Sequence, residues 1–202
     1  MLVEQLCEGL ASEGFNLIGM AAPAAYDARV REDLRLALRA PWARSVVVVG
    51  NGGGDLWRRV EAWAATSGGI ADKADPVDEY TTTTVERVAA PILADAGVRS
   101  RLAYPFRFAE EPISFVDLAA AAGLGAPSLL RVLVHPVYGP WMALRAAILV
   151  DVELDAPRPA EGYDPCPACV ERSCIAACPG SVVRYPEGWD VEGCIAHRRA
   201  TG

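Results

Sequence analysis

Four cysteines lie within thirteen positions near the C-terminal end of the chain, and a fifth follows a short distance later. Thiol side chains at such close spacing bind a metal ion, hold a redox cluster or form disulfides. The chemistry of this protein is therefore expected first in its C-terminal segment. The cysteines concerned are Cys166, Cys169, Cys174, Cys178 and Cys194.

The order of the cysteines favours an iron–sulfur cluster. The run C-x2-C-x4-C-x3-C-P is close to the bacterial ferredoxin run C-x2-C-x2-C-x3-C-P, with two additional residues between the second and third thiols. A cubane needs thiolates that converge from several directions, so a tight loop supplies some ligands and a more distant cysteine completes the set. The first three cysteines are predicted ligands of a [4Fe–4S] cluster, and the sequence leaves open whether Cys178 or Cys194 is the fourth.

Zinc is the alternative occupant, because C-x2-C and C-x3-C pairs also suit a tetrahedral site with four cysteine ligands. Disulfides are a further alternative. The Cys178-Pro179 step and the apolar context IAACPGSVV favour iron over both. The sixth cysteine, Cys7, lies on the apolar face of a predicted helix and is expected to be a core thiol.

Composition indicates a globular chain with one well-cored domain and a small appendage. The 202 residues are 52% hydrophobic and 22% charged, with a net charge of −7. The acidic balance gives no strong signal for nucleic acid, since phosphate-binding surfaces need an excess of Lys and Arg. No apolar run reaches the roughly 18 residues of a membrane span, and the N-terminus lacks a basic signal region. We therefore expect a cytoplasmic protein with reduced thiols and no membrane association.

Helical and strand-like patterns alternate over residues 1–155, which predicts an α+β fold, an α/β sheet domain that forms a cofactor pocket. A proline-rich linker follows, and residues 156–202 form a ferredoxin-like, cysteine-rich tail. The loop NGGGD after a buried strand lacks the spacing of a nucleotide-binding motif, so a turn that caps a helix is expected there. The predicted helices cover 2–15, 26–40, 56–66, 75–97 and 115–125, and the predicted strands cover 15–22, 45–50, 98–106, 129–136 and 142–154.

The order of several short segments resembles epoxyqueuosine reductase and its relatives among the cobalamin-dependent iron–sulfur enzymes, which include reductive dehalogenases. The resemblance is carried by five segments that occur in the same order as in that family. They are EGFNLIGMA, PWARSVVVVG, AGLG, LVHPVYGPW and CPACVERSCIAACPGSVV…GCIAHR. The resemblance implies a nitroreductase-like fold that cradles cobalamin, with a ferredoxin-type cluster beside it.

The same resemblance directs attention to two further sets of residues. Tyr138, Gly139 and Trp141 either line a cofactor pocket or form a tight turn with an aromatic plug. His135 either faces the cofactor or is a structural hydrogen-bonding residue before a proline. The proton-donating aspartate of the family corresponds to Ala109, so the adjacent Glu110 and Glu111 either substitute for it or form a solvated pair.

Two other segments depart from the family. The W-I-G-K-N segment that follows A-G-L-G in the family is APSLL here, so its lysine and amide are missing. The sequence also ends before the second cysteine motif and the tRNA-contacting repeats of the family, so at most one cubane is expected.

These observations lead to one hypothesis and an alternative of another class. The chain is predicted to be an iron–sulfur redox protein, in which one cluster transfers electrons to a bound small-molecule cofactor, cobalamin among the choices, or to a donor or acceptor protein. If it is an enzyme it is an oxidoreductase, and epoxyqueuosine itself is not its expected substrate. The alternative is a non-enzymatic protein that binds or carries a corrinoid, or one whose tail is held together by zinc.

Overall fold

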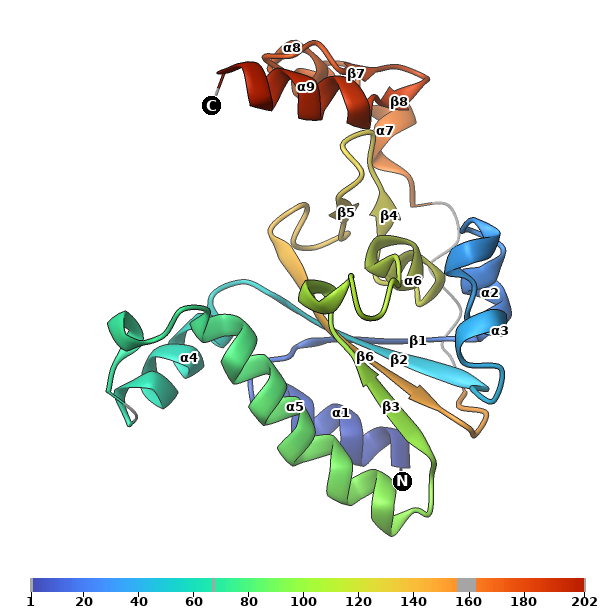
Figure 1. Cartoon of the computed structure of the whole chain (residues 1–202), viewed down its shortest axis with the longest axis vertical. Helices are drawn as coiled ribbons and strands as arrows, with labels where there is room; N and C mark the ends of the chain where they lie inside the picture. The colour runs from blue at the N-terminus through green and yellow to red at the C-terminus, as the bar shows by residue number, and fades with distance from the viewer. Residues whose placement is uncertain (1, 67, 156–162, 202) are drawn as a thin grey trace.

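A four-stranded antiparallel sheet forms the centre of the molecule, which we describe from a computed structural model covering residues 2–66, 68–155 and 163–201 (Figure 1). The strand order is β1-β2-β6-β3, so the first and second strands are neighbours and the last strand inserts between β2 and β3. The strands are β1 (Leu17–Ala21), β2 (Ser45–Gly52), β3 (Ser100–Ala103) and β6 (Met142–Val150).

The two central strands follow directly from the sequence pattern. Every residue of β2 is buried, as expected for the continuous β-branched run that starts at Ser45. Its partner β6 pairs Val49 with Ala146 and then Gly50 with Leu144. Arg145 is thus the extra residue of a β-bulge, and its Nε donates to Asn51 Oδ1 at 2.8 Å.

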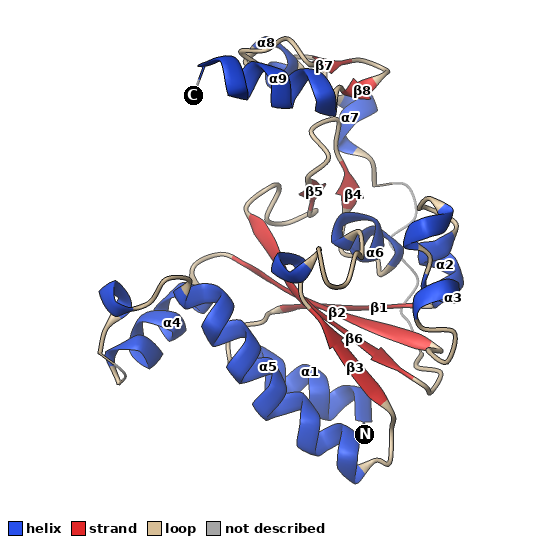
Figure 2. Cartoon of the chain, viewed as in Figure 1, coloured by secondary structure: helices blue, strands red, loops and turns tan. Residues whose placement is uncertain are grey.

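Helices cover both faces of the sheet, and each face has its own hydrophobic core (Figure 2). The mixed helix-and-sheet fold predicted from the sequence is confirmed. One face carries α1 (Leu2–Ser12), α4 (Asp55–Ala65) and α5 (Pro76–Asp95), and the other carries α2 (Pro23–Asp27), α3 (Leu36–Arg39) and α6 (Phe115–Ala121).

The prediction of one helix over residues 26–40 is wrong. The chain forms α2, a 3₁₀ turn η1 (Glu32–Leu34) and then α3. The carboxylate of Asp27 explains the break, because it accepts hydrogen bonds from the backbone N–H groups of Leu36 (2.7 Å) and Ala37 (3.0 Å). Asp27 therefore caps the start of α3 from nine residues away, which a continuous helix does not allow.

The strand predicted over residues 129–136 is also wrong in its extent. Only β5 (Leu133–Val134) forms, and it pairs with β4 (Ala126–Pro127). The residues between them make a tight turn in which Arg131 has a left-handed φ of 58° and its N–H donates to Ser128 O at 2.9 Å. The sequence pattern indicated a strand because the turn consists largely of apolar residues, two leucines among them.

The cysteine-rich segment folds into short elements that lie beyond the β4–β5 hairpin, at the top of Figure 1. The division into residues 1–155 and 156–202 stays a prediction, and residues 156–162 of the predicted linker lie outside the described residues. Within the described ranges, no helix combines the length and hydrophobicity needed to cross a bilayer. The elements of this segment are α7 (Pro165–Ala168), α8 (Ser173–Ala176), β7 (Val183–Arg184), β8 (Gly188–Trp189) and α9 (Val191–Thr201).

Candidate functional site: the cysteine segment and the turn beside it

The five clustered cysteines are distributed over three short helices and the turns that end them. Cys166 lies in α7 and Cys169 ends it, Cys174 lies in α8 and Cys178 follows it, and Cys194 lies in the first half of α9. All five are free thiols. The chain can turn sharply between α7 and α8 because one residue, an arginine, adopts a left-handed conformation there.

Backbone N–H groups point at three of the sulfur atoms. The Sγ of Cys166 accepts a hydrogen bond from Leu129 N at 3.4 Å, and the Sγ of Cys169 accepts one from Arg172 N at 3.4 Å. The pKa of the Cys178 thiol is lowered, chiefly by the backbone N–H of Val182 and further by those of neighbouring residues in the same turn. Such N–H groups stabilise thiolates, the form in which cysteine binds metals.

The segment buries very little hydrophobic surface. Over residues 163–201, the hydrophobic side chains that are buried are Val182 and Val183. A segment of this size needs disulfides, a metal or another staple in addition to such a core. The free cysteines of this segment are the residues that could supply such a staple.

The donor set fits an iron–sulfur cluster in its chemistry. It offers five thiols, with N–H groups directed at three of them, and an arrangement over consecutive turns. Among the described residues, no three His, Cys, Asp or Glu side chains are already gathered in a metal-binding group. A cluster would therefore have to draw the thiols together.

The helix α9 is joined to the cysteine turns at its beginning. Its cap is Asp190, whose Oδ1 accepts the N–H of Gly193 at 2.9 Å and whose own N–H donates to Val182 O at 2.8 Å. Further along, the ring of His197 lies over Gly180, where an added Cβ would be 3.1 Å from the ring. These contacts hold Cys194 on the helix that packs against the turn after Cys178.

A second group of predicted residues, His135 to Trp141, forms a tight turn. The Nδ1 of His135 accepts the N–H groups of Val137 (3.0 Å) and Tyr138 (3.3 Å), and its backbone pairs with Gly139 in both directions. Burial lowers the pKa of this histidine, which is consistent with a neutral ring that accepts at Nδ1. This geometry matches the structural alternative that the sequence left open for His135.

Tyr138 packs on the glycine-rich loop. A Cβ on Gly52 would overlap the Tyr138 ring, and the Tyr138 hydroxyl accepts a hydrogen bond from Asn16 Nδ2 at 3.3 Å. Asn16 also bonds both backbone groups of Gly52. Trp141, by contrast, is 83% exposed. The turn thus sends its tyrosine inward and leaves its tryptophan on the surface.

The predicted acidic pair is split between two environments. Glu111 forms an ion pair with Arg101 at 2.7 Å, and its side chain is 21% exposed. Glu110 and Ala109 are exposed on the turn after η3 (Pro105–Arg107). Both glutamates line a cavity that also contains three arginines, Arg39, Arg101 and Arg107. The sequence pattern gives no sign of this arginine group, because its members come from three separate elements.

The fold of this chain resembles those of known proteins, although its sequence does not. No family model matches the chain, and no curated protein matches it significantly in sequence. Solved structures do match. Epoxyqueuosine reductase from Streptococcus thermophilus has a TM-score of 0.71 and 12% identity, covering 100% of this chain and 59% of that protein. The chain therefore spans less than two thirds of that enzyme's length.

Two further structures have the same fold. The B12-trafficking protein CblC from C. elegans has a TM-score of 0.58 and 14% identity, over 78% of this chain and 74% of CblC. The catabolic reductive dehalogenase NpRdhA has a TM-score of 0.60 and 19% identity, over 94% of this chain and 28% of the dehalogenase. The resemblance predicted from the five sequence segments is confirmed as a resemblance of fold.

Proposed function

We propose that this chain is an iron–sulfur redox protein whose cysteine segment exchanges electrons with a corrinoid bound between that segment and the sheet domain. The observation that carries the proposal is the combination of five free thiols with a small core, since the buried hydrophobic side chains over residues 163–201 are Val182 and Val183. A staple is needed there, and the order of the cysteines, ending in Cys178-Pro179, is that of ferredoxin loops.

The ligands in this proposal are Cys166, Cys169 and Cys174, with either Cys178 or Cys194 as the fourth. When bound, a [4Fe–4S] cluster supplies one-electron transfer. The protein contributes the N–H groups that face the sulfurs, among them Leu129 N at 3.4 Å from Cys166 Sγ. That bond links the cysteine segment to the β4–β5 hairpin of the sheet domain.

The space for a cofactor in this proposal lies beside that link. A cavity of about 550 Å³ separates the hairpin from the cysteine segment. Arg131 lines it on the hairpin side, and Cys166 and Trp189 line it on the other. The cavity is large enough for one edge of a corrinoid but not for the whole macrocycle, and the part that enters it would contact Cys166, a proposed cluster ligand, directly. Electron exchange requires such proximity. The corrinoid itself is suggested by the fold that this chain has in common with the B12-trafficking protein CblC.

The test is metal and sulfide analysis of protein produced and purified without oxygen. We expect about four iron and four labile sulfide per chain, with broad visible absorption that bleaches on reduction. Single Ser substitutions at Cys166, Cys169 or Cys174 should remove this absorption, as should one of the two at Cys178 and Cys194. Cys7→Ser is the matched control and should leave the spectrum unchanged. Stoichiometric zinc without labile sulfide would contradict the proposal.

A corrinoid carrier is the second candidate, and one observation favours it. The B12-trafficking protein CblC has the fold of this chain over 78% of this chain's residues. A carrier requires the cofactor pocket and no cluster. Hydroxocobalamin binding that is unchanged in Cys166→Ser and Cys169→Ser, in protein without iron, would favour the carrier over the redox protein.

A further inference from the structure

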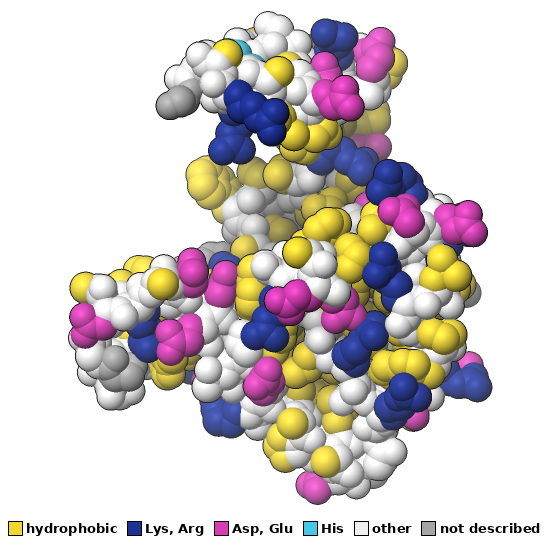
Figure 3. All heavy atoms as spheres, viewed as in Figure 1, with side chains coloured by type: hydrophobic (Ala, Val, Ile, Leu, Met, Phe, Trp, Pro, Cys, Tyr) yellow, Lys and Arg dark blue, Asp and Glu magenta, His cyan; other side chains and the backbone are white. Residues whose placement is uncertain are grey.

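A cavity of about 450 Å³ lies between α3, β3 and the turn that follows η3, away from the cysteine segment. Side chains of both charges are interspersed on this face of the molecule (Figure 3). The volume is within the range of sites for small molecules. The cavity is lined by Leu38, Arg39, Arg101, Leu102, Ala103, Tyr104, Arg107, Glu110 and Glu111.

The charges of the cavity do not cancel. Arg101 is neutralised by Glu111, whose Oε1 lies 2.7 Å from Arg101 Nη2 without hydrogen-bond geometry, so the pair is held by electrostatic attraction. Arg39 and Arg107 have no ion pair with a carboxylate in the described part of the chain. Two guanidinium charges and the carboxylate of Glu110, which has no ion pair among the described residues, are therefore left on the cavity wall, a net charge of +1 in a protein whose net charge is −7.

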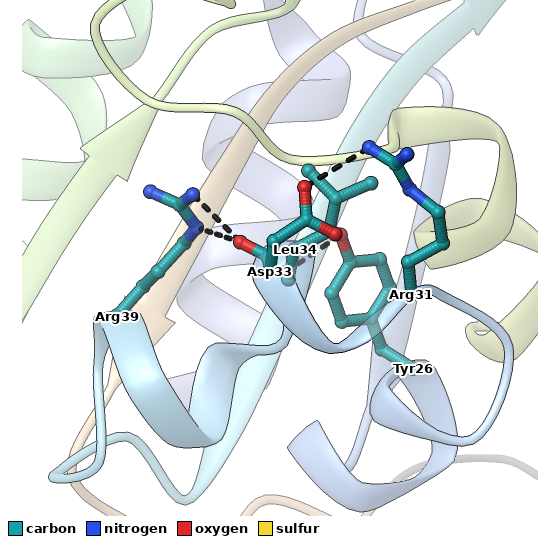
Figure 4. Close-up of polar contacts among 5 residues, drawn as sticks. All are labelled: Tyr26, Arg31, Asp33, Leu34 and Arg39. Atoms are coloured by element: carbon teal, nitrogen blue, oxygen red, sulfur yellow. Dashed lines mark hydrogen bonds and ion pairs between the residues drawn. The ribbon is translucent and has the colours of Figure 1, made fainter.

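Arg39 is oriented without being neutralised. Its Nε and Nη2 both donate to the backbone oxygen of Asp33, at 3.0 and 2.7 Å (Figure 4). The carboxylate of Asp33 pairs instead with Arg31 at 2.9 Å. A carbonyl oxygen carries only a partial charge, so this arrangement fixes the Arg39 guanidinium and keeps most of its positive charge for another partner.

A buried tyrosine holds the two walls of the cavity together. The Tyr26 side chain is fully buried, and its hydroxyl donates to Leu34 O at 3.3 Å, next to the carbonyl that holds Arg39. The same hydroxyl accepts the N–H of Ser114 at 3.0 Å, at the end of the loop that carries Glu110. The walls are thus positioned before any ligand arrives, which lowers the entropic cost of binding.

Arg107 is held by aromatic rings. Its guanidinium lies 5.1 Å from the centroid of Tyr104 and 5.9 Å from that of Phe106. Cation–π contacts position a guanidinium while leaving its N–H groups and its charge available. Glu110, which has no ion pair among the described residues, supplies a hydrogen-bond acceptor on the same wall.

We propose that this cavity binds a phosphate monoester of a small hydroxylated molecule, such as a sugar phosphate. Arg39 and Arg107, the two guanidiniums without a carboxylate partner, attract the doubly charged phosphate, while Glu110 lowers the net charge of the wall to +1. The planar guanidinium forms paired hydrogen bonds with phosphate oxygens. The Glu110 carboxylate accepts hydrogen bonds from hydroxyl groups of the ligand. It repels ligands, such as bisphosphates, that carry a second negative group on the side facing Glu110. This site is independent of the cysteines and of the redox function proposed above.

The test is calorimetric titration of the whole chain with ribose 5-phosphate, inorganic phosphate and ribose. Ribose 5-phosphate should bind and ribose should not. Arg39→Gln and Arg107→Gln should each weaken binding by about tenfold or more, because each removes charge-assisted hydrogen bonds. The matched control is Arg44→Gln, since Arg44 is exposed, pairs with Glu153 outside the cavity and should leave binding unchanged. Thermal unfolding of each variant checks that it is folded.

The proposal fails under any of three results. The first is no binding of ribose 5-phosphate at millimolar concentration. The second is equal binding by wild type, Arg39→Gln and Arg107→Gln. The third is equal affinity for ribose 5-phosphate and inorganic phosphate, which would remove the role of the hydroxyl groups. Because these titrations do not depend on the cluster, their failure would leave the redox proposal unaffected, and loss of the redox proposal would leave this one standing.

Discussion

At the scale of single residues, Gly52 is the position where the absence of a side chain matters most clearly. The Tyr138 ring occupies the space that a Cβ on Gly52 would need. Gly52→Ala should therefore lower the free energy of unfolding by about 1–3 kcal/mol through overpacking. Urea denaturation monitored by fluorescence measures the change.

Gly54→Ala is the control for that substitution. Its Cβ would meet only the end of the Arg58 side chain at 3.5 Å, an ordinary contact, and the change should cost no more than about 0.5 kcal/mol. Adding Tyr138→Ala to Gly52→Ala should give a double variant that is more stable than the sum of the two single effects predicts. Strict additivity would mean that the tyrosine is not the obstacle.

His135 predicts a dependence of stability on pH. Its folded-state pKa is lowered by burial, and Nδ1 accepts two backbone N–H groups, so the neutral ring is the stabilising form. The unfolded chain, with a pKa near 6.5, binds the proton more readily. This contribution is therefore present above about pH 6.5 and is lost as the pH falls through the folded-state pKa.

The measurement is the free energy of unfolding of wild type and His135→Asn between about pH 5 and 7.5. Asparagine offers an oxygen acceptor that does not titrate there, so the variant should lose less stability than wild type on acidification. The pH-dependent contribution of the carboxylates to the free energy of unfolding is the same in both proteins, so it cancels in the difference between them. Parallel pH profiles would exclude this role for His135.

At the scale of elements, the stability of helix α9 depends on the side-chain cap at its start. Removing the Asp190 carboxylate leaves the Gly193 N–H without its side-chain acceptor. Asp190→Ala should destabilise the helix by about 1 kcal/mol, and Asp190→Asn should retain most of the cap. Hydrogen exchange of the α9 amides should be faster in the alanine variant and nearly unchanged in the asparagine variant. Equal exchange in all three proteins would show that the cap contributes nothing.

The elements that the sequence predicted well are those whose pattern is set locally. Strand β2 is a continuous β-branched run, and α5 begins after Asp75 with Pro76 in its first turn, as predicted, although Asp75 makes no side-chain cap bond. Segment 26–40 was mispredicted because its break depends on Asp27 reaching the start of α3, a contact that periodicity does not encode.

The candidate sites also differ in whether their residues are close in sequence or are brought together only by the fold. The cysteines could be proposed as ligands from the sequence because their spacing within one short segment is itself the signal, and this assignment stays a prediction. The arginine-lined cavity was not, because residues 39, 101 and 107 meet only through the fold, and no motif links them. The role of the Tyr26 hydroxyl, which contacts both walls of the cavity, likewise follows from the folded chain and not from the sequence pattern.

At the scale of the whole molecule, the chain has the fold of epoxyqueuosine reductase, but the residue predicted to correspond to that family's proton-donating aspartate is Ala109. In the structure Ala109 is an exposed residue with no acidic function, and the nearby Glu111 is engaged by Arg101. A fold does not by itself preserve an activity. We therefore expect no reduction of epoxyqueuosine by this chain with cobalamin and a strong reductant.

Product analysis by chromatography tests this expectation, with a competent epoxyqueuosine reductase as the positive control. Ala109→Asp is the informative variant, since it restores a carboxylic acid at the aligned position. Turnover by the unaltered chain would show that Glu110 or another group has taken over proton donation. Loss of that turnover in Glu110→Gln would identify the glutamate.

The bond from Leu129 N to Cys166 Sγ has a consequence for how this protein can change over generations. The donor is a main-chain amide, and every amino acid except proline provides one. A substitution at position 129 by any residue except proline therefore keeps the donor of this hydrogen bond. The hydrogen bond depends on the backbone conformation of the hairpin and not on which amino acid occupies position 129. Related chains can therefore retain the bond with different residues at that position.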